Sequence, residues 1–282
     1  MDARQKRLAV FEITSYTIKN SPRLQAAVAA SREGQQIRWE EDPLPIPAAR
    51  YDNPAQLRLT LKKTVEAAGP YARAGKKVCI LNFASPVSPG GGVTKGSQAQ
   101  EESICRVSTL YFALSHRETA GEFYDRHWAM IRAREMNRKN RDDVIYTPGI
   151  IAIRDDSNDE TLLQEEEWYA MDVITCAAPD LRQIVFDKSQ YSPGREELKT
   201  VLENRWRRIL ATAAEQGAEV LILGAFGCGV FACPPELVAE TFSNVQQDYL
   251  HCFETIEFAV LAANREAPNY RAFRAIPGIR EM

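Results

Sequence analysis

The sequence predicts an α/β fold in which a mixed or parallel sheet is covered by helices on both faces. Short apolar runs rich in branched residues alternate along the chain with helical patterns. Two of these runs lead through a glycine-rich loop into a helix, at residues 78–111 and 219–238. No repeat or low-complexity linker divides the 282 residues. We therefore expect one domain over residues 1–282, with residues 1–50 as a helical extension packed on it.

The composition is that of an ordinary globular protein, with 45% hydrophobic and 26% charged residues. A net charge of −3 argues against broad binding to duplex nucleic acid, which depends on clustered Lys and Arg. No apolar run approaches the roughly 18 residues of a membrane span, and no apolar stretch follows the basic N-terminus as in a secretory signal. We expect no membrane partner, a cytoplasmic location and six reduced, mostly buried cysteines.

The first 75 residues are predicted to be a mainly helical lead-in. A short extended piece at residues 14–18 comes before a helix around residues 24–30. Ser21 and Pro22 suit the N-cap and the first position of that helix.

A loop and a second helix follow in this N-terminal part. Three prolines within residues 42–50 indicate a loop. A helix is predicted from Asn53 to about Gly69, because three apolar residues fall on one helical face: Leu57, Leu61 and Val65.

The middle of the chain is predicted to change from helix to strand. Residues 112–142 continue a highly charged helical pattern. Residues 144–154 suggest two strands broken by a Pro-Gly turn, and the acidic run at 155–167 suggests a solvated loop or helix face. A buried strand at 169–177 and a loop at 179–191 follow.

The C-terminal part is predicted to alternate between helix and strand. An amphipathic helix covers residues 196–216 and ends at a glycine, and a buried strand covers 219–223. The helix after the second glycine-rich loop opens with Pro234-Pro235, where a helix start tolerates proline. A final strand at 253–263 and a short terminal helix at 269–276 complete the chain.

The first glycine-rich loop carries the strongest functional signal. The apolar run Val78–Leu81 suits a buried parallel strand, and three consecutive glycines, Gly90-Gly91-Gly92, let a ligand approach the backbone closely. The helix that follows begins with Glu101 and Glu102. Because a helix N-terminus presents free N–H groups to anions, this unit places general acid/base groups beside a phosphate site.

The second glycine-rich loop, residues 224–231, has the same context of buried strand and helix. In sheets of this class, ligands bind outside the carboxyl ends of the strands, so the two loops are expected to flank one crevice. A diphosphate suits two facing sets of backbone N–H groups. The alternative is that both loops are only tight turns.

Other nucleotide and hydrolase motifs do not match. Residues 91–96 have the glycine spacing of a P-loop, but Ser97-Gln98 stand where Lys and Ser/Thr are required. The glycines of residues 224–229 do not form a dinucleotide-binding fingerprint, and no Gly-x-Ser-x-Gly elbow is present.

The histidines and cysteines do not indicate a metal or a nucleophile. His116, His127 and His251 form no zinc-binding pattern, and the first two are expected to be ordinary surface or partly buried helix residues. Cys228 and Cys233 lack a second cysteine pair, and Cys228 has no neighbouring histidine to activate it. We therefore expect no metal and no cofactor.

The pattern of three glycines, eight residues and then Gln100-Glu101-Glu102 resembles the signature of poly(ADP-ribose) glycohydrolases. Bacterial-type members are also similar to the surrounding stretch 79–111 and to residues 172–179. Residues 223–231, Leu-Gly-Ala-Phe-Gly-Cys-Gly-Val-Phe, resemble the diphosphate loop of this family. The resemblance covers roughly residues 50–265 and is weaker toward the N-terminus.

The resemblance implies a macrodomain-like, three-layer α/β/α fold with a mixed sheet. It also implies hydrolysis of the ribose–ribose O-glycosidic bond in poly(ADP-ribose), with Glu102 as the catalytic acid and Glu101 as its ribose-binding neighbour. The implied substrate-binding set comprises Gly90, Gly91, Gly92, Gln100, Gly227, Cys228, Gly229, Val230 and Phe231. Many macrodomains have Asn where Ser85 stands, so no ribose contact is assigned to Ser85.

The chemistry suits these residue types. Glycosidic cleavage requires a proton on the leaving oxygen, and an ordinary glutamate is mostly ionised at pH 7. We expect the charges of Glu101 and a bound diphosphate to raise the pKa of Glu102, against the opposing effect of the helix N-terminus. The expected substrate is poly(ADP-ribose) or ADP-ribosylated protein, the product is ADP-ribose, and the chain is expected to be a monomer.

Two alternatives remain open at this point. The chain could hydrolyse mono-ADP-ribosylated protein or another ADP-ribose derivative, or it could be a non-catalytic ADP-ribose-binding module. The pair Glu101-Glu102 argues against the module, because a protein that only binds needs no acid.

Overall fold

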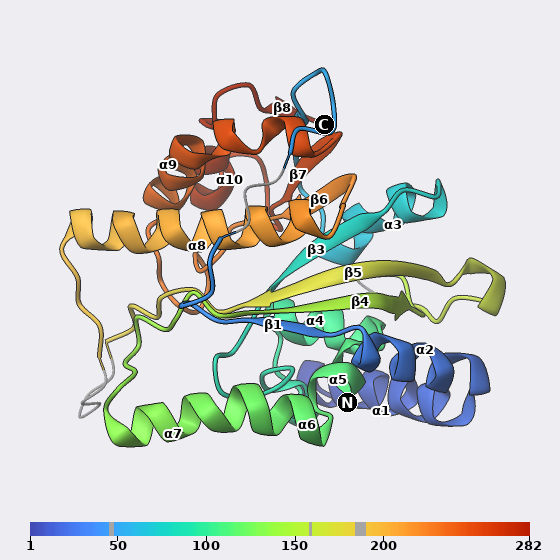
Figure 1. Ribbon diagram of the computed structural model, residues 1–282. Coiled ribbons are helices and arrows are strands. Elements are labelled where there is room, and N and C mark those ends of the chain that lie inside the picture. Colours follow the sequence, from blue (N-terminus) through green and yellow to red (C-terminus); the bar gives the residue numbers. More distant parts are fainter. Residues whose placement is uncertain (45–47, 158–159, 184–189) are drawn as a thin grey trace.

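The computed structural model describes residues 1–282 except 45–47, 158–159 and 184–189, and it has an eight-stranded mixed sheet between two layers of helices (Figure 1). The strand order is β1-β4-β5-β3-β6-β7-β2-β8. Neighbouring strands pair in parallel, except that β4 is antiparallel to both β1 and β5. The predicted α/β/α fold class is confirmed.

The strands are β1 (Gln36–Arg38), β2 (Gln56–Thr60), β3 (Val78–Phe83), β4 (Val144–Ala152), β5 (Tyr169–Cys176), β6 (Val220–Leu223), β7 (Thr255–Ala259) and β8 (Arg280–Glu281). The α-helices are α1 (Ala3–Asn20), α2 (Pro22–Glu33), α3 (Thr64–Arg73), α4 (Gln100–Val107), α5 (Leu110–Leu114), α6 (Arg117–Thr119), α7 (Arg126–Ala133), α8 (Arg195–Glu215), α9 (Pro235–Val245) and α10 (Pro268–Arg274). A π-helical turn at Ala120–Asp125 connects α6 to α7.

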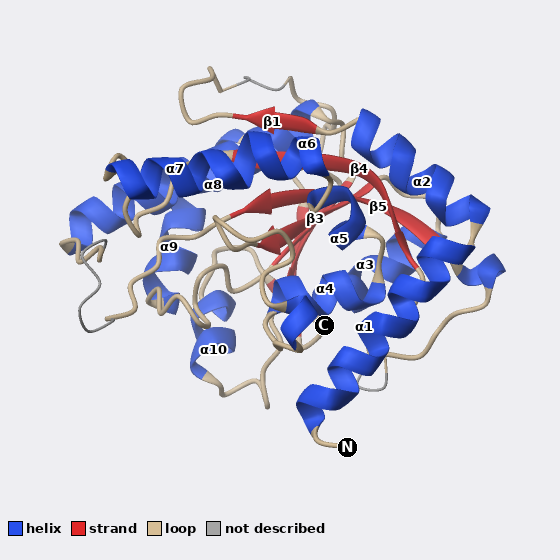
Figure 2. Ribbon diagram, turned by 90° about the horizontal axis from the view of Figure 1, so that it is seen from below, coloured by secondary structure: helices blue, strands red, loops and turns tan. Residues whose placement is uncertain are grey.

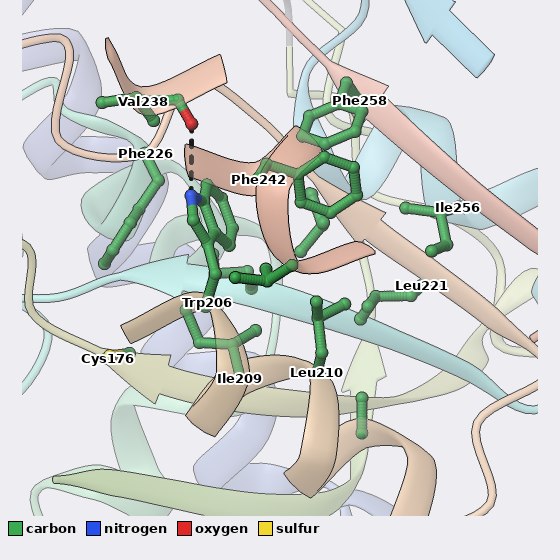
Figure 3. Packing of buried hydrophobic residues seen from close by; sticks show 14 of the residues in the cluster. Cys176, Trp206, Ile209, Leu210, Leu221, Phe226, Val238, Phe242, Ile256 and Phe258 are labelled. Carbon is green, nitrogen blue, oxygen red and sulfur yellow. Dashed lines mark hydrogen bonds between the residues drawn. The ribbon is translucent and has the colours of Figure 1, made fainter. Parts of the chain in front are cut away.

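Each face of the sheet has its own apolar core. The core under α8, α9 and α10 contains Trp206, Phe242 and Phe258, and the indole N–H of Trp206 donates to the carbonyl of Val238 at 3.2 Å (Figure 3). The core on the other face lies under α3, α4 and α5, with α1 outside them; Figure 2 shows α1, α4 and α5 from that side. Burial on both faces explains why the central strands are continuous apolar runs.

The N-terminal prediction was wrong at residues 14–18, which belong to α1 rather than to an extended piece. Asp2 and Gln5 form a reciprocal capping box that starts this helix. Phe11, Thr14 and Ile18 lie on one helical face and are buried. The branched residues that suggested an extended segment are therefore spaced for a helix.

The predicted helix from Asn53 was wrong in its first half. Residues 56–60 form β2, which pairs in parallel with β7, and the helix α3 begins only at Thr64. Leu57 and Leu59 are buried on either side of Arg58, which is the period of a strand. The helix also continues beyond the predicted end, because α3 includes Pro70 and ends at Arg73.

Two further predictions in the middle of the chain were wrong. Residues 144–152 form one strand, β4, because β5 pairs with it on both sides of a register shift at Pro148-Gly149. The helical pattern predicted for residues 112–142 breaks after α5 and ends with α7.

The strand predicted at 253–263 is not the last one. It is β7, shortened to five residues, and β8 follows α10 and pairs with β2 at the edge of the sheet. The predicted strands at 78–81, 169–177 and 219–223 and the three C-terminal helices are confirmed. The predicted loops at 42–50 and 179–191 have no regular structure where they are described; residues 45–47 and 184–189 lie outside the described residues.

Candidate active site

Gln100 fixes the start of α4 to the end of β3. Its Oε1 accepts from the backbone N–H of Phe83 at 2.8 Å, and its Nε2 donates to the carbonyl of Leu81 at 2.7 Å and to Thr64 Oγ1 at 2.9 Å. The side chain predicted to bind substrate is therefore engaged with the protein. This anchoring sets where the next two residues of α4 point.

Glu101 is buried beside the end of β3. Its Oε2 accepts from the backbone N–H of Ser85 at 2.8 Å, and its Oε1 accepts from Asn82 Nδ2 at 3.3 Å. Burial raises the pKa of Glu101 to about 8, and the charge of Glu102 adds to this rise against the hydrogen bonds from Ser85 and Asn82. The sequence interpretation did not predict a raised pKa for Glu101.

Glu102 has one carboxylate oxygen fixed and one free. Its Oε1 accepts from the backbone N–H of Gly92 at 2.8 Å. Its Oε2 is buried and has no hydrogen-bond partner among the described residues. The other three oxygens of the glutamate pair all accept protein N–H groups, so this oxygen alone remains for a substrate.

The glycines of the first loop leave space for the carboxylates of Glu101 and Glu102. Gly91 has a φ of +57°, and a Cβ on it would lie 2.6 Å from Glu102 Oε1 and 3.0 Å from Glu101 Oε2. The N–H of Gly91 donates to the carbonyl of Ser88, and that of Gly92 donates to Glu102. These N–H groups are thus already used, although we expected both loops to present N–H groups to a diphosphate.

The second loop, residues 224–231, differs from the first because four of its N–H groups have no acceptor in the described part of the chain. Gly227 and three later members of the loop donate to no acceptor among the described residues: Gly229, Val230 and Phe231. A Cβ on Gly229 would meet nothing within 4 Å, and the Val230 side chain is 58% exposed. Free backbone donors beside open space are suited to bind an anion.

One contact at each end of the second loop fixes its shape. Phe226 is fully buried, and its ring centroid lies 5.7 Å from that of Phe83 and 5.6 Å from that of Trp206. Figure 3 shows Phe226 beside Trp206. The N–H of Cys233 donates to the carbonyl of Gly227 at 3.0 Å, and Gly227 has a φ of +75°. The apolar anchor and the turn leave only the tip of the loop exposed.

The two loops lie at the same edge of the sheet. β3 and β6 are neighbouring parallel strands, and each loop leaves the carboxyl end of its strand. The rings of Phe83, at the end of β3, and Phe226, in the second loop, are in contact across this edge. The predicted crevice between residues 90–92 and 227–231 therefore has the required topology.

A buried ionic network behind α4 was missed by the sequence interpretation. Arg106 makes a bidentate pair with Glu160 at 2.8–3.1 Å and donates to the carbonyl of Ser97. Asp156 accepts from Ser103 Oγ at 2.9 Å, and burial raises the pKa of Asp156 to about 6. The acidic run predicted to be solvated is thus buried at these two positions, where its carboxylates pair with α4.

The N-terminal helix also supports the first loop. Arg4 and Arg7 on α1 donate to the carbonyls of Lys95 and Gly96, both at 2.8 Å. A Cβ on Gly96 would lie 2.8 Å from the carbonyl oxygen of Arg4. Residues 1–20 are therefore part of the frame that holds the site, and no local sequence signal indicated this.

His127 on α7 is a second residue whose role was missed. It is buried, with Nδ1 2.8 Å from the carbonyl of Pro86 and Nε2 2.9 Å from Asp143 Oδ2. Pro86 belongs to the loop that leads to the three glycines. His127 therefore ties α7 to the first loop.

The described residues hold no group of three or more His, Cys, Asp or Glu side chains arranged for a metal ion. All six cysteines are free thiols, and burial raises the pKa of the Cys228 thiol, which disfavours a nucleophilic thiolate. Within the described chain, none of the helices has both the length and the apolar composition that a membrane span requires.

Comparison with known proteins now adds to this geometry. Residues 4–155 match the family model described as the catalytic domain of microbial-type PARG. The poly(ADP-ribose) glycohydrolase from Thermomonospora curvata has a similar structure, with 31% identity, a TM-score of 0.81 and coverage of 96% of this chain and 98% of that one. The chain belongs to the microbial-type poly(ADP-ribose) glycohydrolase family.

Other solved members of the family include ligand complexes. The Thermomonospora curvata glycohydrolase bound to the inhibitor ADP-HPD matches with 29% identity and a TM-score of 0.78, over 96% of this chain and 98% of that one. The Deinococcus radiodurans glycohydrolase in complex with ADP-ribose matches with 30% identity and a TM-score of 0.74, over 88% and 95%. A search of curated protein sequences finds no match.

The family match extends further toward the N-terminus than the sequence resemblance did. It begins at residue 4 and includes the first glycine loop and both glutamates. The second loop lies outside residues 4–155 but inside the region that the structural matches cover almost entirely. The contacts of α1 with residues 95 and 96 give a physical reason for including the N-terminal helix.

Proposed function

We propose that this protein hydrolyses the ribose–ribose O-glycosidic bond of poly(ADP-ribose) and releases ADP-ribose, with Glu102 as general acid and base. Family membership supports the reaction. The observation that supports the role of Glu102 is its Oε2, which has no hydrogen-bond partner among the described residues, next to an Oε1 that the N–H of Gly92 holds in place. A carboxylate with one oxygen fixed and one free is oriented for proton transfer.

In this proposal the second loop binds the diphosphate. The free N–H groups of Gly227 and residues 229–231 donate to its oxygens, and the Phe231 ring lies near the terminal ribose. The terminal ribose then reaches the neighbouring loop, where the glycines allow close approach to Glu101 and Glu102. Glu101 acts as a ribose-binding neighbour rather than as a second acid.

The chemical step uses one carboxyl group twice. Glu102 Oε2 donates a proton to the oxygen of the leaving ribose as the glycosidic bond breaks through an oxocarbenium-like state. The resulting carboxylate then takes a proton from the water that attacks the anomeric carbon. The proton and the leaving group are both accounted for without a metal or redox cofactor.

We also propose that residues 1–282 act as one domain, as a monomer in the cytoplasm. The edge strands β1 and β8 have only three and two residues, so they offer little backbone for pairing with another chain. Six free thiols suit a reducing compartment. Light scattering of the purified chain would test the monomer, and a stable dimer would contradict it.

The test of the activity is incubation with purified poly(ADP-ribose), followed by chromatography of the products. We expect free ADP-ribose from the parent protein and at least a hundredfold slower release from Glu102→Gln. Glu122→Gln, at an exposed glutamate, is the matched control and should keep parent activity. Undiminished release by Glu102→Gln would remove Glu102 from the catalytic role, and no release by the parent protein would reject the activity itself.

A further inference from the structure

We propose that α7 and the turn after it form a second polymer-binding subsite, which holds the ADP-ribose unit next to the one being released. The subsite consists of Trp128, Arg132, Arg134 and Lys139. It rests on the proposed function, because its ligand is the remainder of the same polymer. Each ADP-ribose unit offers an adenine ring and two phosphates, and the subsite has groups for both.

Residues 126–141 are strongly basic in a chain of net charge −3. They contain a single acidic residue, Glu135, against six basic residues: Arg126, Arg132, Arg134, Arg138, Lys139 and Arg141. A concentration of positive charge of this kind attracts polyanions.

Half of these cations are already paired within the protein. Arg126 pairs with Glu41, Arg138 with Asp180, and Arg141 with Asp143 and Glu41. For Arg132, Arg134 and Lys139, by contrast, no acidic partner lies within ion-pair distance among the described residues, and both arginines are exposed. These three side chains are available to a phosphate.

An exposed aromatic ring lies on the same helix as Arg132. The large aromatic side chain of Trp128 is 43% exposed. It precedes Arg132 by four residues on α7, so the two side chains lie on the same face of the helix. An aromatic ring next to an arginine suits an adenine that stacks and a phosphate that pairs.

The order of the strands indicates the side on which the polymer leaves. The proposed diphosphate loop follows β6, and the glutamates follow the next strand, β3. The bond to be cleaved therefore lies at β3, and the rest of the polymer continues toward β5 and β4. In Figure 1 the carboxyl ends of β3 and β5, the end of α7 and the start of α8 lie at the same side of the molecule.

The basic segment is linked to both loops of the site, directly ahead of the first loop and through residues 180–181 to the second. At its start, His127 contacts the carbonyl of Pro86 ahead of the first loop. Near its end, Asp180 donates its N–H to the carbonyl of Arg138, and the adjacent Leu181 donates its N–H to the carbonyl of Phe231 in the second loop. Arg132 and Arg134 lie between these two anchors along the chain and Lys139 follows the second, so the proposed subsite belongs to the segment that connects the two loops.

The test compares Arg132→Glu/Arg134→Glu and Trp128→Ala with a control, Lys19→Glu/Arg271→Glu. The control reverses two exposed cations on α1 and α10, for which the described residues provide no ion pair. Three quantities are measured for each variant: kcat/KM on long polymer, Kd for free ADP-ribose, and the affinity for uncleaved long polymer in a Glu102→Gln background. The salt dependence of the polymer affinity is recorded as well.

We expect the charge reversal to lower polymer affinity and kcat/KM about tenfold at low salt, and to reduce the slope of log affinity against log salt by roughly 0.7 for each lost phosphate contact. Trp128→Ala should lower polymer affinity about fivefold or more. The Kd for ADP-ribose should stay at the parent value. Equal losses of affinity for polymer and for ADP-ribose, or a polymer affinity equal to that of the control, would overturn the subsite.

The proposed activity and the subsite can fail separately. If the parent protein bound polymer but did not cleave it, the proposed activity would be rejected, and the polymer affinities of the variants would still show whether the subsite exists.

Discussion

The two glycine-rich loops look alike in sequence but differ in what their backbones bind. In the first loop, the N–H groups of Gly91 and Gly92 are used within the protein, and the missing side chains make room for two carboxylates. In the second, the N–H groups of residues 229–231 have no acceptor within the part of the chain that the structure describes, and a Cβ on Gly229 would meet nothing within 4 Å. A glycine cluster can therefore hold a catalytic group or bind an anion, and the hydrogen bonds distinguish the two cases.

The largest expected effect concerns how the second loop is anchored. Phe226→Ala removes a fully buried ring from the core, so we expect it to lower the free energy of unfolding by about 3–5 kcal/mol. Phe231→Ala changes a partly buried ring at the tip of the same loop, so it should cost less than about 1 kcal/mol and raise KM instead. Denaturant unfolding and steady-state kinetics separate these outcomes; equal destabilisation would mean that the tip is only structural.

The next effect concerns the space that Gly91 leaves for the carboxylates of Glu101 and Glu102. Gly91→Ala puts a Cβ 2.6 Å from Glu102 Oε1 at a positive φ, so we expect kcat to fall about a hundredfold through displacement of that carboxylate. Gly229→Ala is the matched control in the other loop, where the Cβ meets nothing within 4 Å. It should change kcat by less than about threefold. A kcat for Gly91→Ala within threefold of the parent would contradict the role of the first loop.

A smaller effect follows from the buried acid in the first loop. The folded-state pKa of Glu101 is about 8, above its ordinary value near 4.3, so the folded protein keeps a proton that the unfolded chain loses. Stability should therefore fall as pH rises from about 4.3 to 8. Glu101→Gln should remove this loss and be more stable than the parent at pH 8 by on the order of a few kcal/mol, with little difference at pH 4. Urea unfolding at both pH values checks this, with Glu122→Gln as control; a parent-like pH dependence in Glu101→Gln would refute it.

The smallest effect concerns a single free donor in the second loop. Val230→Pro removes one N–H from the proposed diphosphate site, whereas Val230→Ala keeps it. We expect Val230→Pro to weaken ADP-ribose binding about tenfold, the typical value of a hydrogen bond to a charged group, and Val230→Ala to change it by less than twofold. Parent-like binding by Val230→Pro, measured by calorimetry, would remove this N–H from the site.

The sequence was sufficient to predict both strand–loop–helix units, because their signals are local. The apolar runs of β3 and β6, the glycines and the acid pair all lie within a short window. β2 was not predicted, because its pairing partner β7 lies about 200 residues away, and its leucines also fit a helical face. The pair of Arg106 with Glu160 and the docking of Arg4 and Arg7 were missed for the same reason.

The central claim is that the first loop positions the catalytic carboxylate and the second binds the diphosphate. It is tested most directly by measuring ADP-ribose binding by calorimetry and polymer turnover on both Glu102→Gln and Val230→Pro. The account predicts that Glu102→Gln binds ADP-ribose within a few-fold of the parent yet releases almost none from polymer. It predicts that Val230→Pro binds ADP-ribose about tenfold more weakly while keeping a near-parent kcat at saturating polymer. The reverse pattern, with lost binding in Glu102→Gln or lost kcat in Val230→Pro, would contradict it.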